Sequence, residues 1–448
     1  MLSPDDALTR LDAALAAARA AGADAADAVY VGDGAAHVSV RLGKLEDTGR
    51  AEGEEVGLRV FVGQRSASVS SSDLSPAALA EAAERAVAMA RLAPEDRFAG
   101  LAPEDRLAKG ELPDPDIDDA TEIGAAALRE RALACEDAAR AVAGVTNSEG
   151  AGASAGVMVM ALATSTGFRG ARRSTSHGLS ASVVAGAGSD MQRDYAWHSA
   201  RYLADVEAAD AIGRRAGERA VARLHPMKLA SAAMPVLFDP RVSASLLGHL
   251  VGAITGSAIA RGTSFLKDRL GQRILPAGLS VIDDPLRHRG LRSRAFDGEG
   301  LATARTAIID DGILTTWLMD VASARQLGLS PTGHASRGTS GPPGAGTSNL
   351  HLEGGRIARA DLIGGVTRGV LVTELIGMGV NGLTGDYSRG ASGFLIENGE
   401  IAGPVAEITV AGNLIDMFAN MVAADDLAFR HASNAPTLRI DGMTVAGS

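Results

Sequence analysis

Hydrophobic and polar residues along the first part of the chain predict helices that flank a small sheet. Ser3-Pro4 is a typical helix start, and the leucines that follow it recur at helical spacing up to Gly22. Between Asp27 and Ser71 hydrophobic and polar residues alternate, which is typical of antiparallel strands. Ser75-Pro76 then begins a second helix that ends near Arg91. We therefore expect residues 1–91 to form an α/β sandwich-like domain.

A proline-rich, acidic segment separates this domain from the next. The sequence Leu-Ala-Pro-Glu-Asp-Arg occurs at residues 92–97 and again at 101–106. Units that stack into repeat architectures are at least about 20 residues long, so the two copies indicate a linker over residues 92–117. Residues 118–225 are predicted to form a middle α+β domain. Its expected helices cover about 118–142 and 205–224, and its expected strands lie near 155–163, 176–185 and 192–203.

The remaining residues, 226–448, are predicted to form a larger, mainly β domain. Asp311-Gly312 and Asn398-Gly399 each stand between short hydrophobic runs, and both dipeptides favour the tight turn of a β-hairpin. Between them, residues 328–348 are rich in Gly, Ser, Thr and Pro, which indicates a mobile surface loop or a loop ordered by a partner. The chain as a whole is thus expected to be an α+β protein with three domains.

Composition and charge narrow the classes of function. With 43 Lys and Arg against 54 Asp and Glu, the formal net charge of the 448-residue chain is −11, so its field repels nucleic acids and acidic membranes. Cys135 is the only cysteine, which excludes an internal disulfide and any cysteine-cluster metal site. The longest nearly apolar run, residues 246–260, is too short to cross a bilayer, and the N-terminus has no signal-peptide pattern. We expect a soluble cytoplasmic protein that binds neither nucleic acid nor membrane.

Two short motifs match functional patterns but lack the required context. Gly377-Met-Gly379-Val-Asn-Gly382 matches the dinucleotide-binding fingerprint, which requires a helix directly after it. A strand is predicted there instead, so a glycine-rich loop in a sheet is the preferred interpretation. Gly152-Ala-Ser154-Ala-Gly156 matches the nucleophile elbow of serine hydrolases. A strand is expected after it as well, which favours a turn between strands over a hydrolase built on Ser154.

The residue types that bind metals are dispersed along the chain. No two of the nine histidines are closer than 17 positions, and no helix carries the paired histidines of a zinc peptidase. Asp283-Asp284 and Asp297-Gly298-Glu299 are candidates for a shared hard cation. Solvated carboxylates in turns are the preferred interpretation of both groups.

The segment from Asp239 to Ala260 is the most informative part of the chain. It begins with a helix start, Asp239-Pro240, and carries Gly248, Gly252 and Gly256 on one helical face. Each glycine inside a helix costs about 1 kcal/mol relative to alanine, so something must approach this face closely. Tight packing against another element is the simpler interpretation. A former active-site helix that has lost its functional side chains is the alternative.

Several further stretches resemble one known family. They are GHLVGAI at 248–254, RGTSF at 261–265, DGIL at 311–314, SARQLGL at 323–329, TGHA at 332–335, LVTEL at 371–375, TGDYSRGA at 384–391, IENGEI at 396–401 and ITVAGNL at 408–414. With these stretches the sequence resembles the TldD/TldE (PmbA) family, and within it the TldE branch. The resemblance implies a cytosolic zinc peptidase assembled from two homologous subunits, of which the TldD-type chain carries H-E-x-x-x-H on a helix and a later cysteine ligand.

This chain departs from the catalytic pattern that the resemblance implies. Alignment on Arg261-Gly-Thr-Ser264 places Leu247, Gly248 and Gly252 where the two histidines and the glutamate would stand. No cysteine follows Cys135 either. Leucine and glycine side chains offer neither a ligand to Zn²⁺ nor a general base. We therefore expect no catalytic residue, metal site or cofactor in this chain, and zinc on its partner.

The resemblance implies a non-catalytic subunit that pairs with a TldD-type zinc-bearing homologue to degrade or trim unfolded peptides. The sequence leaves open whether the isolated chain forms a homodimer, and a homodimeric peptide-binding scaffold without peptidase activity is the alternative function. The older family name is modulator of DNA gyrase, but a net charge of −11 gives no support for direct contact with DNA. Candidates for lining the peptide channel or the subunit contact are Thr384, Asp386, Tyr387, Ser388, Arg389 and His249. A hydrogen-bonded turn and an interior histidine are the structural alternatives for them.

Overall fold

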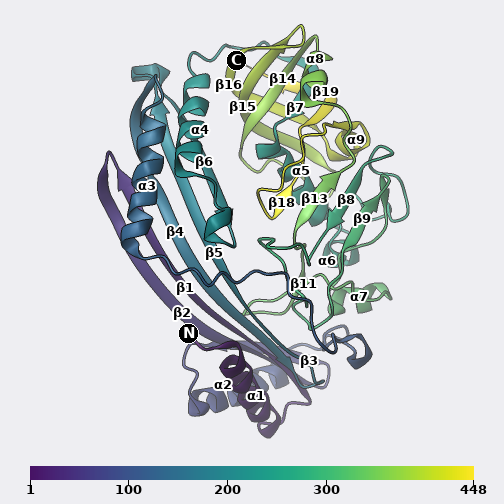
Figure 1. Ribbon diagram of the computed structural model, residues 1–448. Helices are drawn as coiled ribbons and strands as arrows, with labels where there is room; N and C mark the ends of the chain where they lie inside the picture. The colour runs from purple at the N-terminus through teal and green to yellow at the C-terminus, as the bar shows by residue number, and fades with distance from the viewer. Residues whose placement is uncertain (448) are drawn as a thin grey trace.

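The computed structural model describes residues 1–447 and has an α+β fold, which confirms the predicted class. A long, curved sheet forms one side of the molecule, and the C-terminal domain lies across from it (Figure 1). The strands of the long sheet, in spatial order, are β3 (Arg65–Ser71), β2 (Lys44–Val62), β1 (Ala25–Arg41), β4 (Val145–Thr164), β5 (Arg169–Ala185) and β6 (Gln192–Ala200). All neighbours are antiparallel. Because β1 pairs with β4, the segments expected as N-terminal and middle domains share one sheet.

Helices cover one face of this sheet. They are α1 (Pro4–Ala20), α2 (Pro76–Leu92), α3 (Ala125–Arg140) and α4 (Ala209–Ala222). Ser3 and Ser75 cap α1 and α2 as predicted, each side chain accepting the N–H of the residue three positions on. The helices α3 and α4 begin later than predicted, because the residues before them are extended and bonded to one another. The Asp119 carboxylate, for example, accepts the Leu203 N–H at 2.8 Å.

The opposite face of the long sheet contacts the C-terminal domain in two places. At one of them Val29 and Leu162 of the sheet share a buried cluster with Phe296. At the other, on β6, the Trp197 ring lies 4.4 Å from that of His431, and Arg241 lies over the Tyr195 ring. Farther along the same sheet Met158 and Trp197 are 44% and 41% exposed. The sheet therefore leaves part of its surface uncovered on the side that faces the C-terminal domain (Figure 1).

The segment expected as a linker, 92–117, is packed against the rest of the chain along part of its length. Leu101 and Leu107 are 8% and 7% exposed, and Leu107 belongs to the cluster between the sheet and the C-terminal domain. Leu92, which begins the first copy of the repeated hexapeptide, is 87% exposed. Identical sequences thus occupy different environments, because only the second copy passes between the two bodies.

The C-terminal domain is mainly β, as predicted, and contains two larger sheets. The first has the order β16 (Glu400–Asn413), β15 (Asp386–Glu397), β14 (Arg368–Ile376), β7 (Ala232–Phe238), β19 (Leu438–Ala446) and β17 (Met421–Ala423). Strand β16 also pairs with β19, so this sheet closes on itself. The second has the order β10 (Ile313–Leu314), β9 (Thr306–Asp310), β8 (Ser280–Asp283), β13 (Leu350–Glu353) and β18 (Ser433–Asn434).

The remaining elements of this domain are short, apart from one helix. Strand β11 (Ala335–Ser336) pairs with β12 (Gly344–Ala345). The helices are α5 (Pro240–Ala253), α6 (Gly256–Ala260), α7 (Val321–Leu327), α8 (Arg359–Gly364) and α9 (Leu414–Ala419). Among residues 1–447, no helix combines the length and apolar character needed to cross a bilayer.

Both predicted hairpin turns are present. Asp311 and Gly312 have φ values of 44° and 80°, and Asn398 and Gly399 have φ values of 53° and 80°. Positive φ at both central residues is the mark of a type I′ turn, whose twist matches that of the flanking strands. The turns join β9 to β10 and β15 to β16.

The loop over residues 328–348 is held by the chain itself, so the expectation of a mobile or partner-ordered loop is wrong. The Arg337 guanidinium lies 2.7 Å from the Asp27 carboxylate of β1, and both side chains are almost fully buried. Asp27 also pairs with Arg59 of β2. The Thr339 hydroxyl donates to the Glu55 carboxylate. Because one carboxylate holds two buried arginines, the loop is fastened to the sheet by charge as well as by packing.

Candidate functional site

The helix α5 is where the sequence placed a lost active site. Asp239 caps it by accepting the Arg241 N–H at 3.1 Å, and Pro240 begins it, as predicted. Leu246, Leu247 and Leu250 point into the large core of the C-terminal domain, where each is at most 2% exposed. This face of α5 is therefore committed to packing.

The three glycines of this segment, two on α5 and one at the start of α6, lie on a different face and differ in how closely other atoms approach them. A Cβ built on Gly248 or on Gly252 would meet no other atom within 4 Å. A Cβ built on Gly256, at the start of α6, would lie 2.5 Å from Ser323 Oγ. Tight packing, the simpler interpretation of these glycines, is thus correct for Gly256 and wrong for the other two. Gly248 and Gly252 leave a bare stretch of helix backbone facing open space, here called the glycine face.

The donor set around the glycine face does not fit a zinc ion. Leu247, Gly248 and Gly252 contribute no ligand atom, and Leu247 points into the apolar core. Within residues 1–447, no three His, Cys, Asp or Glu side chains lie close enough together to hold a metal ion. A catalytic zinc site needs three such ligands and an open position for water. We therefore derive no metal-dependent step from the residues of this chain.

Three of the candidate residues meet beside α5. The ring of His249 lies edge-on to that of Tyr387, with 5.9 Å between centroids and an angle of 76°. Within the described chain, His249 Nε2, Tyr387 Oη and Arg389 Nε are buried without a hydrogen-bond partner. Burial raises the pKa of Tyr387 to about 12, and burial together with the Arg389 charge lowers the pKa of His249. At neutral pH the tyrosine and the histidine are therefore both uncharged.

The other candidates form a hydrogen-bonded turn, which was the structural alternative for them. The Thr384 hydroxyl donates to the Asp386 carboxylate at 2.6 Å. Asn413 Nδ2 donates to the Thr384 carbonyl at 2.9 Å and to Asp386 Oδ1 at 3.2 Å, and these side-chain bonds lower the pKa of Asp386. Ser388 pairs through its main chain with Gly379. Side chains alternate along β15, so Tyr387 and Arg389 share one face and Asp386 and Ser388 the other.

The two short motifs at 377–382 and 152–156 are structural, as preferred, but the second lies within a strand and not in the predicted turn. The glycines at 377–382 precede strand β15 and no helix, as the loop interpretation requires. Ser154 lies in the middle of β4, paired with His37 on one side and Gly178 on the other. The predicted turn at 152–156 is therefore wrong. So is the nucleophile elbow, because a serine within a regular strand lacks the strained strand-to-helix turn.

Three of the four acids considered for a hard cation are buried, and not solvated as preferred, while Asp284 is half-buried. Asp283 and Asp297 are each 1% exposed, and Glu299 is 5% exposed. Asp297 accepts the N–H groups of Glu299, Leu301 and Ala335 at 2.9–3.0 Å. Asp283 accepts the Ser348 N–H at 2.7 Å. Backbone donors thus occupy these carboxylates, which gives them a structural role in fixing loops.

One group of charged residues had no signal in the sequence. Arg172, Arg201 and Arg294 come from β5, from just after β6 and from the loop after β8. Burial and the charges of Arg294 and Arg201 lower the pKa of Arg172. Residues this far apart in sequence come together only through the tertiary fold.

Three parts of the chain match three domains of one protein family. The chain matches the PmbA/TldA metallopeptidase domain 1 over residues 26–90, the central domain over 111–224 and the C-terminal domain over 231–447. It is 39% identical over 412 residues to the metalloprotease PmbA of Escherichia coli O157:H7, covering 92% of this chain and 89% of that protein. The chain belongs to the PmbA/TldD family.

Solved structures of this family share the whole architecture. A modulator of DNA gyrase from Bacteroides thetaiotaomicron superposes with a TM-score of 0.92 at 29% identity, covering 100% of both chains. TldE from Thermococcus kodakarensis superposes with a TM-score of 0.87 at 21% identity, covering 98% of this chain and 100% of that one. At that identity the second likeness shows the fold alone. The long sheet and the C-terminal domain are therefore family features.

Proposed function

We propose that this chain is a non-catalytic subunit that pairs with a zinc-bearing TldD-type homologue, and that the pair degrades or trims unfolded peptides in the cytoplasm. The observation that carries the proposal is the composition of α5. Leu247 is part of the core and Gly248 and Gly252 have no side chains, so the three positions that align with the zinc-binding motif offer no ligand and no general base. A member of a metallopeptidase family with such a helix needs its metal chemistry from another chain.

The uncovered part of the long sheet supports the peptide-handling half of the proposal. Tyr195 and Trp197 of β6 are 40% and 41% exposed, on the side of the sheet not covered by the helices. Strand β6 is also the edge of the long sheet. Main-chain hydrogen bonding at a sheet edge tolerates varied side chains, while exposed aromatic rings add apolar contact. An extended peptide of low sequence specificity fits such a surface.

Reconstitution tests the proposal directly. Hydrolysis of an unstructured, fluorescently labelled peptide is measured with the purified chain, with its host's H-E-x-x-x-H homologue, and with both. The zinc content of each sample is measured by mass spectrometry. We expect activity in the mixture and zinc on the homologue alone. As a matched control, the motif glutamate of the homologue is replaced by glutamine, which is expected to abolish the activity of the mixture.

Two outcomes would overturn the proposal. Peptide cleavage by the isolated, zinc-free chain would reveal a catalytic site in this subunit. Failure of the homologue to associate with the chain would instead favour the alternative function, a homodimeric peptide-binding scaffold. Analytical ultracentrifugation of the two chains, separately and mixed, distinguishes these cases.

A further inference from the structure

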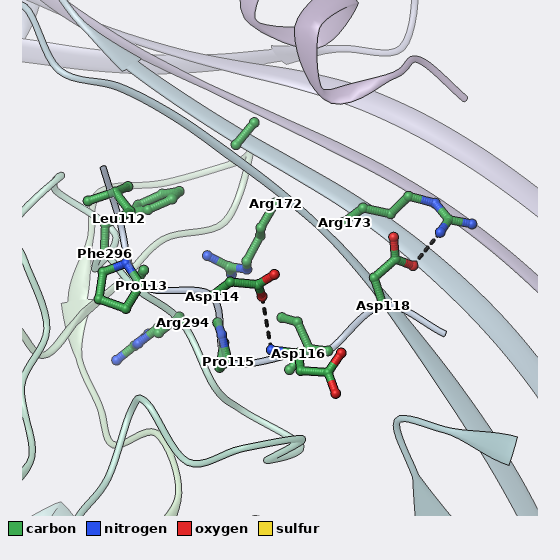
Figure 2. Close-up of a pocket in the computed structure, with 13 residues that line it drawn as sticks. Leu112, Pro113, Asp114, Pro115, Asp116, Asp118, Arg172, Arg173, Arg294 and Phe296 are labelled. Carbon is green, nitrogen blue, oxygen red and sulfur yellow. Dashed lines mark hydrogen bonds and ion pairs between the residues drawn. The ribbon is translucent and has the colours of Figure 1, made fainter. Parts of the chain in front are cut away.

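A pocket lies where three segments meet between the long sheet and the C-terminal domain (Figure 2). Its walls are the extended residues 112–118, Arg172 and its neighbours on β5, and residues 294–296, and its volume is about 330 Å³. Leu112, Pro113 and Phe296 form an apolar side. The pocket is thus accessible to a small group that is partly polar and partly apolar.

Two of the arginines that line this pocket, Arg172 and Arg294, lack acidic partners. The Arg172 guanidinium forms neither a hydrogen bond nor an ion pair with residues 1–447, and it lies 5.6 Å from the centre of the Phe296 ring. Arg294 donates to a single carbonyl, that of Gly346 at 3.3 Å, and its Nε is buried without a partner in the described chain. Arg201 donates only to backbone carbonyls, among them that of Thr175 at 2.8 Å.

The positive charges of Arg294 and Arg201 destabilise that of Arg172. Burial, together with these two charges, lowers the pKa of Arg172 to about 10. A half-buried cluster of like charges without a counter-ion is electrostatically unfavourable, and a bound anion would relieve it. The lining of the pocket and its charge therefore both favour an anionic ligand.

The nearby carboxylates do not neutralise this cluster. Asp118 pairs with Arg173, and Asp116 pairs with Arg289. The charges of Asp283 and Asp297 favour the charged form of Arg294. Both carboxylates, however, accept backbone N–H groups, as described above. Asp114 faces the pocket, where its Oδ1 accepts the Asp116 N–H at 2.9 Å, and it forms no ion pair with the described residues (Figure 2). With these pairs set aside, two arginines of the pocket lining, Arg172 and Arg294, remain against one acid, Asp114.

We propose that this pocket binds an oxyanion between Arg172 and Arg294. The shared chemistry is a group with two or more anionic oxygens, which guanidinium donors match in pairs. A peptide's terminal carboxylate and inorganic phosphate both have this chemistry, and the apolar side at Phe296 would accommodate the last side chain of a peptide. The inference concerns this chain alone and does not depend on its pairing with a zinc-bearing homologue.

Calorimetric titration of the full-length chain at low salt tests the proposal with three probes. They are sodium phosphate, N-acetyl-Ala-Leu as the free acid, and the same dipeptide as its amide. We expect one-to-one binding of an anionic probe and none of the amide. Binding of the free acid alone identifies a carboxylate beside an apolar group as the ligand, and binding of phosphate alone identifies the small anion.

Substitutions locate the binding. Arg172→Gln is expected to weaken it by roughly tenfold or more, since charge-assisted hydrogen bonds are lost. Arg172→Lys keeps the charge but not the paired donors and is expected to bind with intermediate affinity. The control is Arg169→Gln, which removes a charge from the same strand at an exposed residue paired with Asp12. Circular dichroism checks that each variant is folded. No binding of either anion, or equal binding by Arg172→Gln, would overturn the proposal.

Discussion

Replacing Gly248 with alanine is expected to stabilise the isolated chain. A Cβ at this position meets no atom within 4 Å, and Gly248 is not among the residues with positive φ, so alanine fits without strain. Alanine is favoured over glycine inside a helix by about 1 kcal/mol, because it loses less backbone entropy. If residues 231–447 unfold as one unit, this corresponds to a rise of roughly 2–4 °C in the midpoint temperature.

Differential scanning calorimetry of the isolated chain measures this rise, and urea unfolding gives the free energy. Gly256→Ala is the matched control, because its Cβ would lie 2.5 Å from Ser323 Oγ and 2.9 Å from Met319 Cγ. Overpacking of this kind costs roughly 1–3 kcal/mol, so the control is expected to unfold at a lower temperature than the wild type. A lower midpoint for Gly248→Ala as well would refute the inference that the glycine face is open.

Three other perturbations test the buried charges and the single thiol. Burial and Asp297 raise the pKa of Glu299 to about 8, so the folded state holds this proton more tightly than the unfolded state. The free energy of unfolding should therefore fall as pH rises from about 4.5 to about 8, and urea titrations of Glu299→Gln should lack this component. Arg337→Ala removes one of the two cations on buried Asp27 and should cost roughly 3 kcal/mol, measured by urea unfolding, with faster proteolysis of residues 328–348. Burial raises the pKa of Cys135 to about 12, so iodoacetamide should label it only after denaturation, as mass spectrometry would show.

Local structure was predictable because its causes lie within a few residues. The hydroxyls of Ser3 and Ser75 cap helices that begin at the next residue, and Asn398-Gly399 adopts the positive φ values that such a dipeptide favours. The family was also predictable, since its stretches are contiguous in sequence. In each case the chemistry of a short segment limits the conformations that it can adopt.

Long-range pairing was not predictable from periodicity. Strands β1 and β4 pair although Asp27 and Thr164 lie far apart in sequence, and no local pattern records which strand is the neighbour. The alternation around Ser154 is equally compatible with two short strands joined by a turn or with one long strand. The fastening of Arg337 to Asp27 likewise depends on two distant segments meeting. These features arise from tertiary packing, which joins the expected domains into one sheet.

The candidate site was partly predictable, for the same reason. The sequence located the helix α5 and the absence of ligand side chains at Leu247, Gly248 and Gly252 on it. It gave no indication that Tyr387 and Arg389 share a face of β15 near His249 while Asp386 is bonded into a turn. The pocket beside Arg172 and Arg294 had no sequence signal, because its segments meet only in the fold and two of its three acids are paired with other arginines.

The three positions of α5 that align with the expected zinc ligands differ in their structural setting. Leu247 is 2% exposed and contributes to the core, so a histidine there would be placed among apolar side chains. Gly248 and Gly252 instead leave the backbone bare, and apart from the neighbouring backbone of the helix no described atom comes within 4 Å of either Cβ position, so packing within the chain does not explain these glycines. Glycine allows another backbone to approach more closely than a side chain would permit. The glycine face is therefore the part of α5 best suited to contact a second molecule, whether the proposed partner subunit or an extended peptide.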